Sequence, residues 1–116
     1  MRQNLRGWYD FIEKHDEKAL SDMLAEDVVF HSPVVHTPQE GKAITFMYLS
    51  AAGKVLGGDG FHYVGEYISE TGAVLEFNTT IDGIHIDGID MITWNDEGKI
   101  TDFKVMVRPL KAVNKL

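Results

Sequence analysis

The 116 residues contain no cysteine and few basic side chains. Without thiols the chain has no disulfides, no thiolate nucleophile and no cysteine-ligated zinc, which is typical of an intracellular protein, so we expect a cytoplasmic one. Lys and Arg number 11 against 18 Asp and Glu, which gives a formal charge of −7. Such a balance, with no basic run, does not attract phosphate backbones or anionic lipid. We therefore expect neither nucleic acid nor a membrane as a partner.

Long apolar stretches are also missing. No segment approaches the roughly 18 consecutive apolar residues that span a bilayer, and residues 1–8 lack the apolar stretch of a secretory signal. The chain shows no internal repeat and no low-complexity segment. Because 44% of the residues are hydrophobic, residues 1–116 are expected to fold as a single domain with its own core.

The first half of the chain has the hydrophobic spacing of helices. Residues 5–12 carry apolar side chains at the i, i+3, i+4, i+7 positions of one helical face. A second short helix is predicted to begin after Asp16, whose side chain suits an N-cap. A third helix is predicted over residues 42–55, with apolar side chains around most of its circumference, which indicates packing on several sides. Between these helices, residues 27–31 suit a short strand and residues 32–41 a loop.

The second half changes to the alternation of strands. Strands are predicted over residues 61–69, 73–81, 85–94 and 99–107. Each separating segment is a turn signal, and Asp82-Gly83 is among the strongest hairpin signals available. Consecutive hairpins give an antiparallel meander. Pro109 stops strand pairing and suits the first turn of a last helix that runs to Leu116.

This order of elements and three local motifs resemble the nuclear transport factor 2-like superfamily and, within it, the SnoaL-like group. The motifs are Phe30-His31-Ser32-Pro33, Gly41-Lys42-Ala43-Ile44 and Gly88-Ile89-Asp90-Met91-Ile92-x-Trp94-x-x-x-Gly98-Lys99-Ile100. The resemblance covers nearly the whole chain. It implies an α+β fold in which three N-terminal helices pack in a strongly bent, mainly antiparallel β-sheet, and the sheet forms a cone with an internal pocket.

The superfamily includes ketosteroid isomerases, polyketide cyclases, dehydratases, epoxide hydrolases and non-catalytic binding domains, so the fold alone does not give the function. In ketosteroid isomerases a tyrosine and a neutral carboxylic acid stabilise an enolate oxygen while a second carboxylate moves a proton. The resemblance places the neutral acid on Asp90 and the tyrosine on or beside Tyr9, with Trp8 as the alternative. The base position holds Ser32, and serine is not a base near neutral pH. The arginine of the epoxide hydrolases falls on Gly88.

Alternation places Asp90, Ile92 and Trp94 on one face of their strand. A carboxyl group that points into an apolar pocket has a raised pKa, which suits it to donate a proton or a hydrogen bond. The alternative is a structural carboxylate satisfied by Tyr9, by the Trp8 N–H or by a histidine, because a buried carboxylate needs a polar partner. Both interpretations fit the sequence.

A dehydratase-like reaction would use histidines in the pocket. The candidates are His31, His36, His62 and His85. His31 alternates away from Phe30 and Ser32, the expected inward pair, which favours a strand histidine bonded to the following loop. His36 lies on a loop between two prolines, where an exposed histidine is commoner than a catalytic one.

The predicted site combines these residues. The catalytic candidates are Asp90, Tyr9, His31 and His36. The predicted ligand-binding residues are Trp8, Ile12, Phe30, Ser32, Met47, Tyr63, Phe77, Ile92, Trp94, Phe103 and Val105. We expect no metal, since His85 and Asp87 share a strand face without a third ligand, and no cofactor.

Two classes of function remain open. One is a cofactor-independent isomerase, cyclase or lyase that acts by acid/base chemistry on a small, largely apolar, oxygen-bearing molecule. The other is a non-catalytic ligand-binding or dimerisation module of the same fold. The resemblance also implies a homodimer through the outer face of the sheet, and the outward set Lys104, Met106 and Arg108 is compatible with it.

Overall fold

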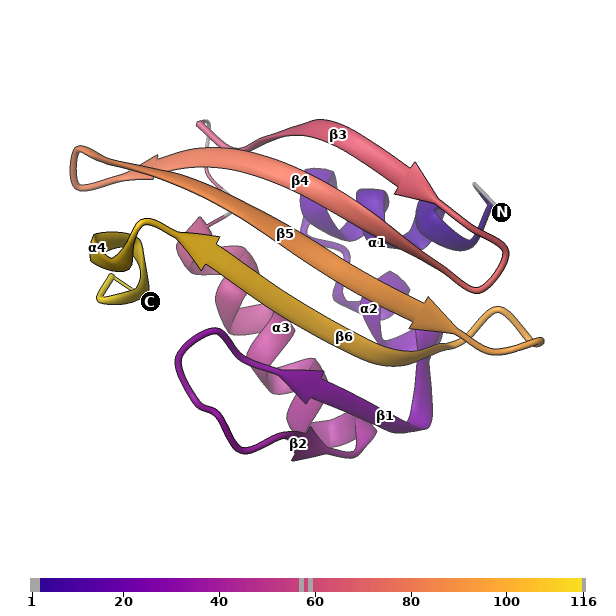
Figure 1. Cartoon of the computed structure of the whole chain (residues 1–116). Coiled ribbons are helices and arrows are strands. Elements are labelled where there is room, and N and C mark those ends of the chain that lie inside the picture. The colour runs from indigo at the N-terminus through magenta and orange to yellow at the C-terminus, as the bar shows by residue number, and fades with distance from the viewer. Residues whose placement is uncertain (1–2, 57, 59, 116) are drawn as a thin grey trace.

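The computed structural model describes residues 3–56, 58 and 60–115. The helices are α1 (Gln3–Lys14), α2 (Glu17–Met23), α3 (Lys42–Leu56) and α4 (Leu110–Val113) (Figure 1). The strands are β1 (Leu24–His31), β2 (Gln39–Glu40), β3 (His62–Ile68), β4 (Gly72–Ile81), β5 (Ile84–Trp94) and β6 (Ile100–Arg108).

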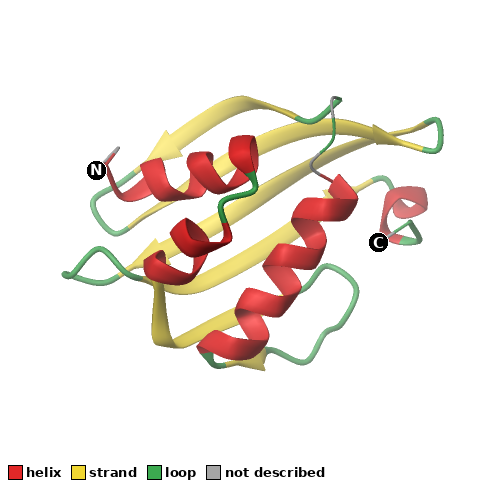
Figure 2. Cartoon of the chain, turned by 180° about the vertical axis from the view of Figure 1, so that it is seen from behind, coloured by secondary structure: helices red, strands yellow, loops and turns green. Residues whose placement is uncertain are grey.

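The strands form one curled sheet in the order β2-β1-β6-β5-β4-β3. Strands β3 to β6 are the predicted antiparallel meander, while β1 pairs in parallel with β6. Helices α1, α2 and α3 cover one face of this sheet, and the opposite face carries no helix among the described elements (Figures 1 and 2). The predicted α+β class, with N-terminal helices packed in a bent, mainly antiparallel sheet, is confirmed. Within the described ranges, none of the helices has the length and apolar character needed to cross a membrane.

Burial follows the periodicities read from the sequence. Leu75, Phe77 and Thr79 are buried on β4, and the residues between them are only half-buried. Asp90 and Trp94 on β5 lie on one buried face, as their alternation predicted. The side chains between this sheet face and the three helices form the hydrophobic core.

The predicted N-cap is present at the second helix. The side chain of Asp16 accepts a hydrogen bond of 3.1 Å from the backbone N–H of Ala19, which satisfies one of the free donors at the start of α2.

Three boundaries differ from the expectation. The first strand, predicted over residues 27–31, begins at Leu24, which pairs with Ile100 of β6. The predicted loop over 32–41 ends in the short strand β2, which pairs with β1 next to Phe30. Helix α4 covers four residues. Its predicted end, Leu116, lies outside the described residues.

Candidate functional site

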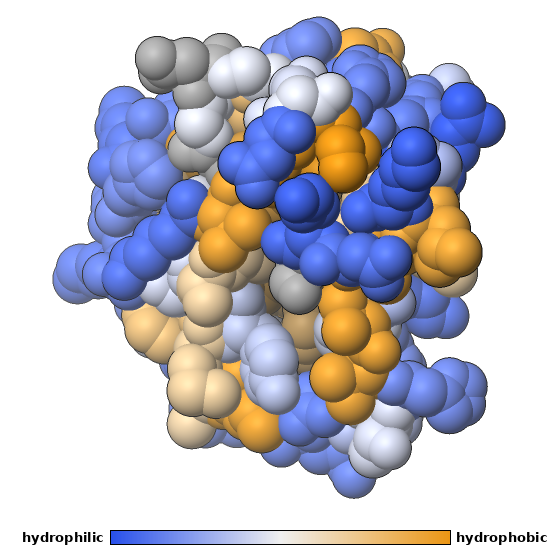
Figure 3. Space-filling model, turned by 90° about the vertical axis from the view of Figure 1, so that its left-hand side faces the viewer, coloured by the Kyte–Doolittle hydropathy of each residue, from blue (hydrophilic) through white to orange (hydrophobic). Residues whose placement is uncertain are grey.

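A cavity of about 340 Å³ lies between the inner face of the sheet and helices α1 and α3. Its lining residues are Trp8, Ile12, Phe30, Ser32, Pro33, Val34, Val35, Tyr48, Leu49, Ala51, Ala52, Gly53, Val55, Leu56, Phe61, Phe77, Asp90, Phe103 and Val105. Val34 and Val55 line the cavity and are also half exposed, at 51% and 52%, so they lie at its opening. The corresponding end of the molecule is hollowed between apolar side chains (Figure 3).

Asp90 is the one carboxyl group among the described residues of this lining. It is placed by β5, where Gly88, two positions earlier on the same face, lies against the ring of Phe77. A Cβ atom on Gly88 would lie 2.4 Å from Cζ of Phe77. The position that carries an arginine in epoxide hydrolases is therefore filled here by an aromatic ring from the neighbouring strand.

A chain of two hydrogen bonds leads from α1 to Asp90. The indole Nε1 of Trp8 donates to the hydroxyl oxygen of Tyr63 at 2.7 Å. That hydroxyl donates in turn to Oδ2 of Asp90, also at 2.7 Å. The three side chains come from α1, β3 and β5, so the chain of bonds connects one helix with two strands of the sheet.

Burial controls the ionisation of this group. Asp90 is 5% exposed, and loss of hydration raises the pKa of its carboxyl group to about 7, while the hydrogen bond from Tyr63 acts in the opposite direction. The pKa of Tyr63 is raised well above its usual value by burial and by the neighbouring Asp90. Tyr63 is therefore a neutral donor throughout the range in which Asp90 titrates.

Many of the predicted ligand-binding residues lie around the cavity. Those that line it are Trp8, Ile12, Phe30, Ser32, Phe77, Phe103 and Val105. Helix α1 contributes Trp8 rather than Tyr9 to the lining, which is the alternative that the sequence left open. That these residues bind a ligand stays a prediction.

The other predicted ligand-binding residues lie elsewhere. Met47 is 57% exposed on α3, and because that helix is apolar around most of its circumference the sequence did not show which side faces inward. Ile92 and Trp94 are buried in the core further along β5, beyond the cavity, where the Trp94 Nε1 donates to the carbonyl oxygen of Glu70. Tyr63 donates a hydrogen bond to Asp90 and is not part of the lining.

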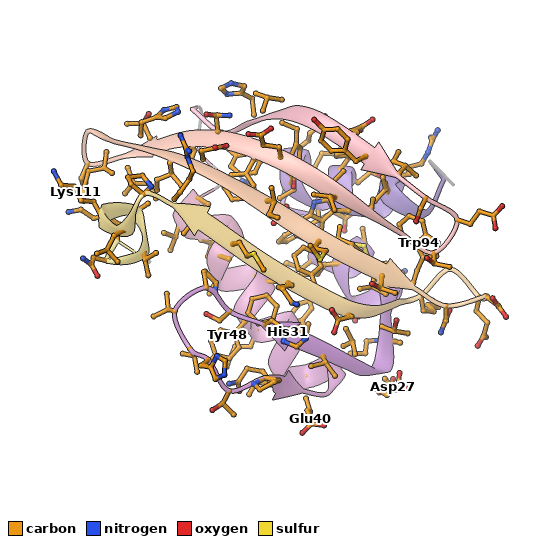
Figure 4. The ribbon with its side chains drawn as sticks, in the orientation of Figure 1. Asp27, His31, Glu40, Tyr48, Trp94 and Lys111 are labelled. Carbon is orange, nitrogen blue, oxygen red and sulfur yellow. The ribbon has the colours of Figure 1, made fainter. Side chains whose placement is uncertain are left out.

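Three predicted catalytic candidates are outside the lining. The Tyr9 hydroxyl donates to the carboxylate of Glu66 on β3. His31 lies at the end of β1 (Figure 4), and its Nε2 atom is 2.8 Å from the Oδ1 atom of Asp102. His36 is exposed on the loop before β2. The structure brings Asp90 together with Trp8 and Tyr63. It does not bring the three other catalytic candidates to that place.

The polar partner of Asp90 was not identified from the sequence, which suggested Tyr9, Trp8 or a histidine. The strand register contains the missing signal, because Tyr63 pairs with Phe77, a residue whose alternation points inward. A register shift between Tyr63 and Gly65 interrupts the alternation of β3, however, and nothing in the local sequence marks it.

No cluster of three or more histidine or acidic side chains that could hold a metal ion is found in the part of the chain that the structure describes.

A family model for SnoaL-like domains matches residues 5–103. The chain belongs to the SnoaL-like domain family. A search of curated proteins found no match to this SnoaL-like domain.

Solved structures agree with the family. The domain is similar to a steroid delta-isomerase from Pseudomonas aeruginosa, with 34% identity and a TM-score of 0.91 over 98% of this chain and 83% of the other. A protein with a cystatin-like fold from Silicibacter pomeroyi has 29% identity and a TM-score of 0.84, covering 95% and 79% of the two chains. An NTF2-like protein of unknown function from Mesorhizobium loti, at 20% identity and a TM-score of 0.79 over 93% and 90%, shares the fold. The predicted superfamily is confirmed.

Proposed function

We propose that this SnoaL-like domain binds a small, largely apolar molecule and holds one oxygen atom of that molecule at Asp90. The observation that supports the proposal is a cavity with an almost entirely apolar lining that contains a single carboxyl group among its described residues. Binding sites for small molecules commonly combine apolar walls with a few polar groups that fix orientation. A ligand with one oxygen function matches this arrangement.

The size of the cavity narrows the ligand class. Its volume of about 340 Å³ is near the lower end of the roughly 300–1,000 Å³ typical of ligand sites. Aromatic rings form part of its walls, among them Trp8, Phe30 and Phe103, which pack against one another with ring centroids 4.8 to 6.2 Å apart. Flat molecules of a few fused rings suit such walls better than flexible chains.

Catalysis by proton transfer is the second candidate function. It is favoured by the pKa of Asp90, about 7, since a group of this acidity is present in both forms at neutral pH. The carboxylate would accept a proton from a carbon next to a carbonyl group, and the acid so formed would return it to a carbon of the same conjugated system. The similar protein from P. aeruginosa is described as a steroid delta-isomerase. Since Ser32 occupies the base position of that chemistry, Asp90 would carry the proton here.

The binding proposal is tested with two probes of the same shape, 2-acetylnaphthalene and 2-isopropylnaphthalene, by isothermal titration calorimetry. We expect the ketone to bind more tightly than the hydrocarbon, and Asp90→Leu to remove that preference. Ala52→Phe, which fills the cavity from α3, is expected to weaken both probes, whereas Met47→Phe on the exposed side of the same helix leaves both unchanged. If the wild type and the three variants all bind each probe with the same affinity, a site in this cavity is refuted.

The same ketone reports on catalysis. The domain is expected to accelerate exchange of the methyl hydrogens of 2-acetylnaphthalene with D₂O, followed by proton NMR, and Asp90→Asn is expected to abolish the acceleration because an amide is not a base. Binding without acceleration would leave the first candidate, a binding module.

A further inference from the structure

The two hydrogen bonds that lead from Trp8 through Tyr63 to Asp90 have one possible direction. An indole N–H is a donor and never an acceptor. The oxygen of Tyr63 must therefore accept from Trp8, and its own proton points to Oδ2 of Asp90. If this direction were reversed at Asp90, the Tyr63 proton would have no acceptor among the described residues, which is costly for a buried hydroxyl.

This direction makes the two oxygens of Asp90 different. Oδ2 accepts the bond from Tyr63, whereas Oδ1 has no hydrogen-bond partner within the described residues. When Asp90 is neutral, its proton resides on Oδ1, because a proton on Oδ2 would meet the proton of Tyr63. Oδ1 is also the oxygen left for a ligand, since Oδ2 already accepts the bond from Tyr63, which is not part of the cavity lining.

We infer that Tyr63, oriented by Trp8, is a positioning residue that keeps the acid proton of Asp90 on Oδ1, so that the domain selects ketones and aldehydes over alcohols of the same shape. The inference rests on the proposed function and extends it to a ligand class. A carbonyl oxygen accepts the Oδ1 proton and needs nothing more. An alcohol that accepts the same bond leaves its own proton in the apolar lining without an acceptor, which is unfavourable.

The preference reverses when Asp90 ionises, because Oδ1 then accepts a bond from an alcohol and offers nothing to a ketone. The groups that surround Asp90 allow this pH dependence of ligand choice to be assigned to the ionisation of Asp90. Tyr63 of β3 is the titratable side chain in contact with it, and the paired residues on β4 and β6, Leu75 and Val105, are apolar. Beyond Tyr63, the ring of Tyr9 lies with its centroid 5.6 Å from that of Tyr63, and Tyr9 bonds to Glu66. The described part of α3 adds no charged side chain to the cavity lining.

The first test needs no ligand. In the wild-type domain, NMR is expected to show the side-chain carbon of Asp90 and the indole N–H of Trp8 titrating together. In Tyr63→Phe the carboxylate loses a hydrogen-bond donor, so the titration midpoint of Asp90 is expected to rise and the Trp8 signal to stop following it. Trp8→Phe is expected to give a smaller rise, since a tyrosine that accepts no bond is a weaker donor. Tyr67→Phe, an exposed tyrosine on the same strand, is the matched control and should titrate as wild type.

The second test measures ligand choice with 2-acetylnaphthalene and 1-(2-naphthyl)ethanol. At a pH well below the titration midpoint of Asp90, we expect the ketone to bind about tenfold more tightly than the alcohol. This is the usual effect of one buried donor without an acceptor. The preference should decline and then reverse in favour of the alcohol as the pH passes the midpoint, and in Tyr63→Phe this change should move to higher pH. A merely structural role of Tyr63 would instead weaken both probes equally at every pH.

The two proposals fail separately. An unchanged Asp90 midpoint in ligand-free Tyr63→Phe overturns the positioning role, whatever the binding results. A wild-type domain that binds neither probe overturns the proposed function and, with it, the selection of ketones.

Discussion

Asp90 binds its proton more tightly in the folded chain than an aspartate does in water. Burial raises the pKa of the carboxyl group from 3.8 to about 7. The folded state therefore keeps a proton that the unfolded state releases, so the stability linked to this group is fully present below the unfolded pKa and is lost as the pH rises through the folded pKa. The shift of about 3 pKa units corresponds to about 4 kcal/mol as an upper value. We predict that the unfolding free energy of the wild type falls between pH 5 and pH 8.

Urea unfolding of the wild type and of Asp90→Asn at these two pH values checks this prediction. The amide accepts the bond from Tyr63 and does not titrate, so the variant should lose this part of the pH dependence and gain stability relative to the wild type as the pH rises. The other titrating groups, such as Glu76 on the outer face, contribute equally to both proteins. Parallel pH profiles for the two proteins would show that Asp90 is solvated or paired in solution.

The residue that carries the site was predictable, and its partner was not. Alternation along β5 was enough to turn Asp90 inward, because it depends on neighbours in sequence. Tyr63 lies 27 residues away, and its contact with Asp90 depends on the register of two hairpins and on an irregularity in β3. The sequence could not tell whether Tyr9 or Trp8 faces the cavity for the same reason. The two are adjacent on one helix, and their surroundings depend on contacts that are distant in sequence.

Two helical glycines differ in the space that their surroundings leave for a Cβ atom. On α1, a Cβ at Gly7 would lie 3.7 Å from the Sδ atom of Met23, an ordinary contact. On α3, a Cβ at Gly53 would lie 2.9 Å from Cζ of the buried ring of Phe11. We predict that Gly7→Ala raises the unfolding free energy by up to about 1 kcal/mol, since alanine favours a helix. Gly53→Ala should lower it by about 1–2 kcal/mol, because the clash with Phe11 outweighs the same gain.

Urea unfolding at one pH compares the two substitutions. The double variant Gly53→Ala with Phe11→Leu, measured against Phe11→Leu alone, supplies the control, because a smaller side chain relieves the contact. If Gly53→Ala stabilises the wild type as much as Gly7→Ala does, the close approach of α1 and α3 is wrong.

At the level of elements, local signals predicted the helices and the meander well. Turn residues such as Asp82 and Gly83 separate strands that pair with their sequence neighbours, so each hairpin is specified nearby. The pairing of β1 with β6 is different, because these strands are distant in sequence and parallel, and their pairing depends on the finished sheet. The two-residue strand β2 exists through its contact with β1, and its own sequence reads as a loop.

For the whole molecule, the outer face of the sheet is the surface to test for a partner. This face, toward the viewer in Figure 1, carries Ile89 and Met106 as cross-strand neighbours, with Met106 48% exposed. Along β4 and β5, the acidic side chains of Glu76 and Asp87 are neighbours to one side, and Lys104 lies to the other. A two-fold rotation would place the lysine of one copy near the acids of the next, an isologous arrangement. The homodimer stays a prediction on these grounds.

Light scattering coupled to size-exclusion chromatography measures the oligomeric state. We expect a mass near twice 13.0 kDa for the wild type, and a shift toward the monomer for Met106→Lys, since a charge in the centre of an apolar contact is unfavourable. Met47→Lys places the same charge on α3, away from the sheet, and should leave the mass unchanged. Monomeric wild type, or equal masses for all three proteins at the same concentration, would exclude the outer face as an interface.

The parallel pairing of β1 with β6 also governs when the cavity can form during synthesis. Phe30 of β1 and Phe103 of β6 are paired neighbours that both line the cavity, although 73 positions separate them in the chain (103 − 30). A ribosome that has made the helices and the first hairpins has produced an incomplete sheet, in which β1 pairs with β2 but lacks its other neighbour, β6. The inner apolar surface is thus exposed until the last strand emerges, and its closure is a late, long-range step of the slow kind that depends on distant contacts. The site is therefore assembled after translation of β6, by two strands that lie far apart in the chain.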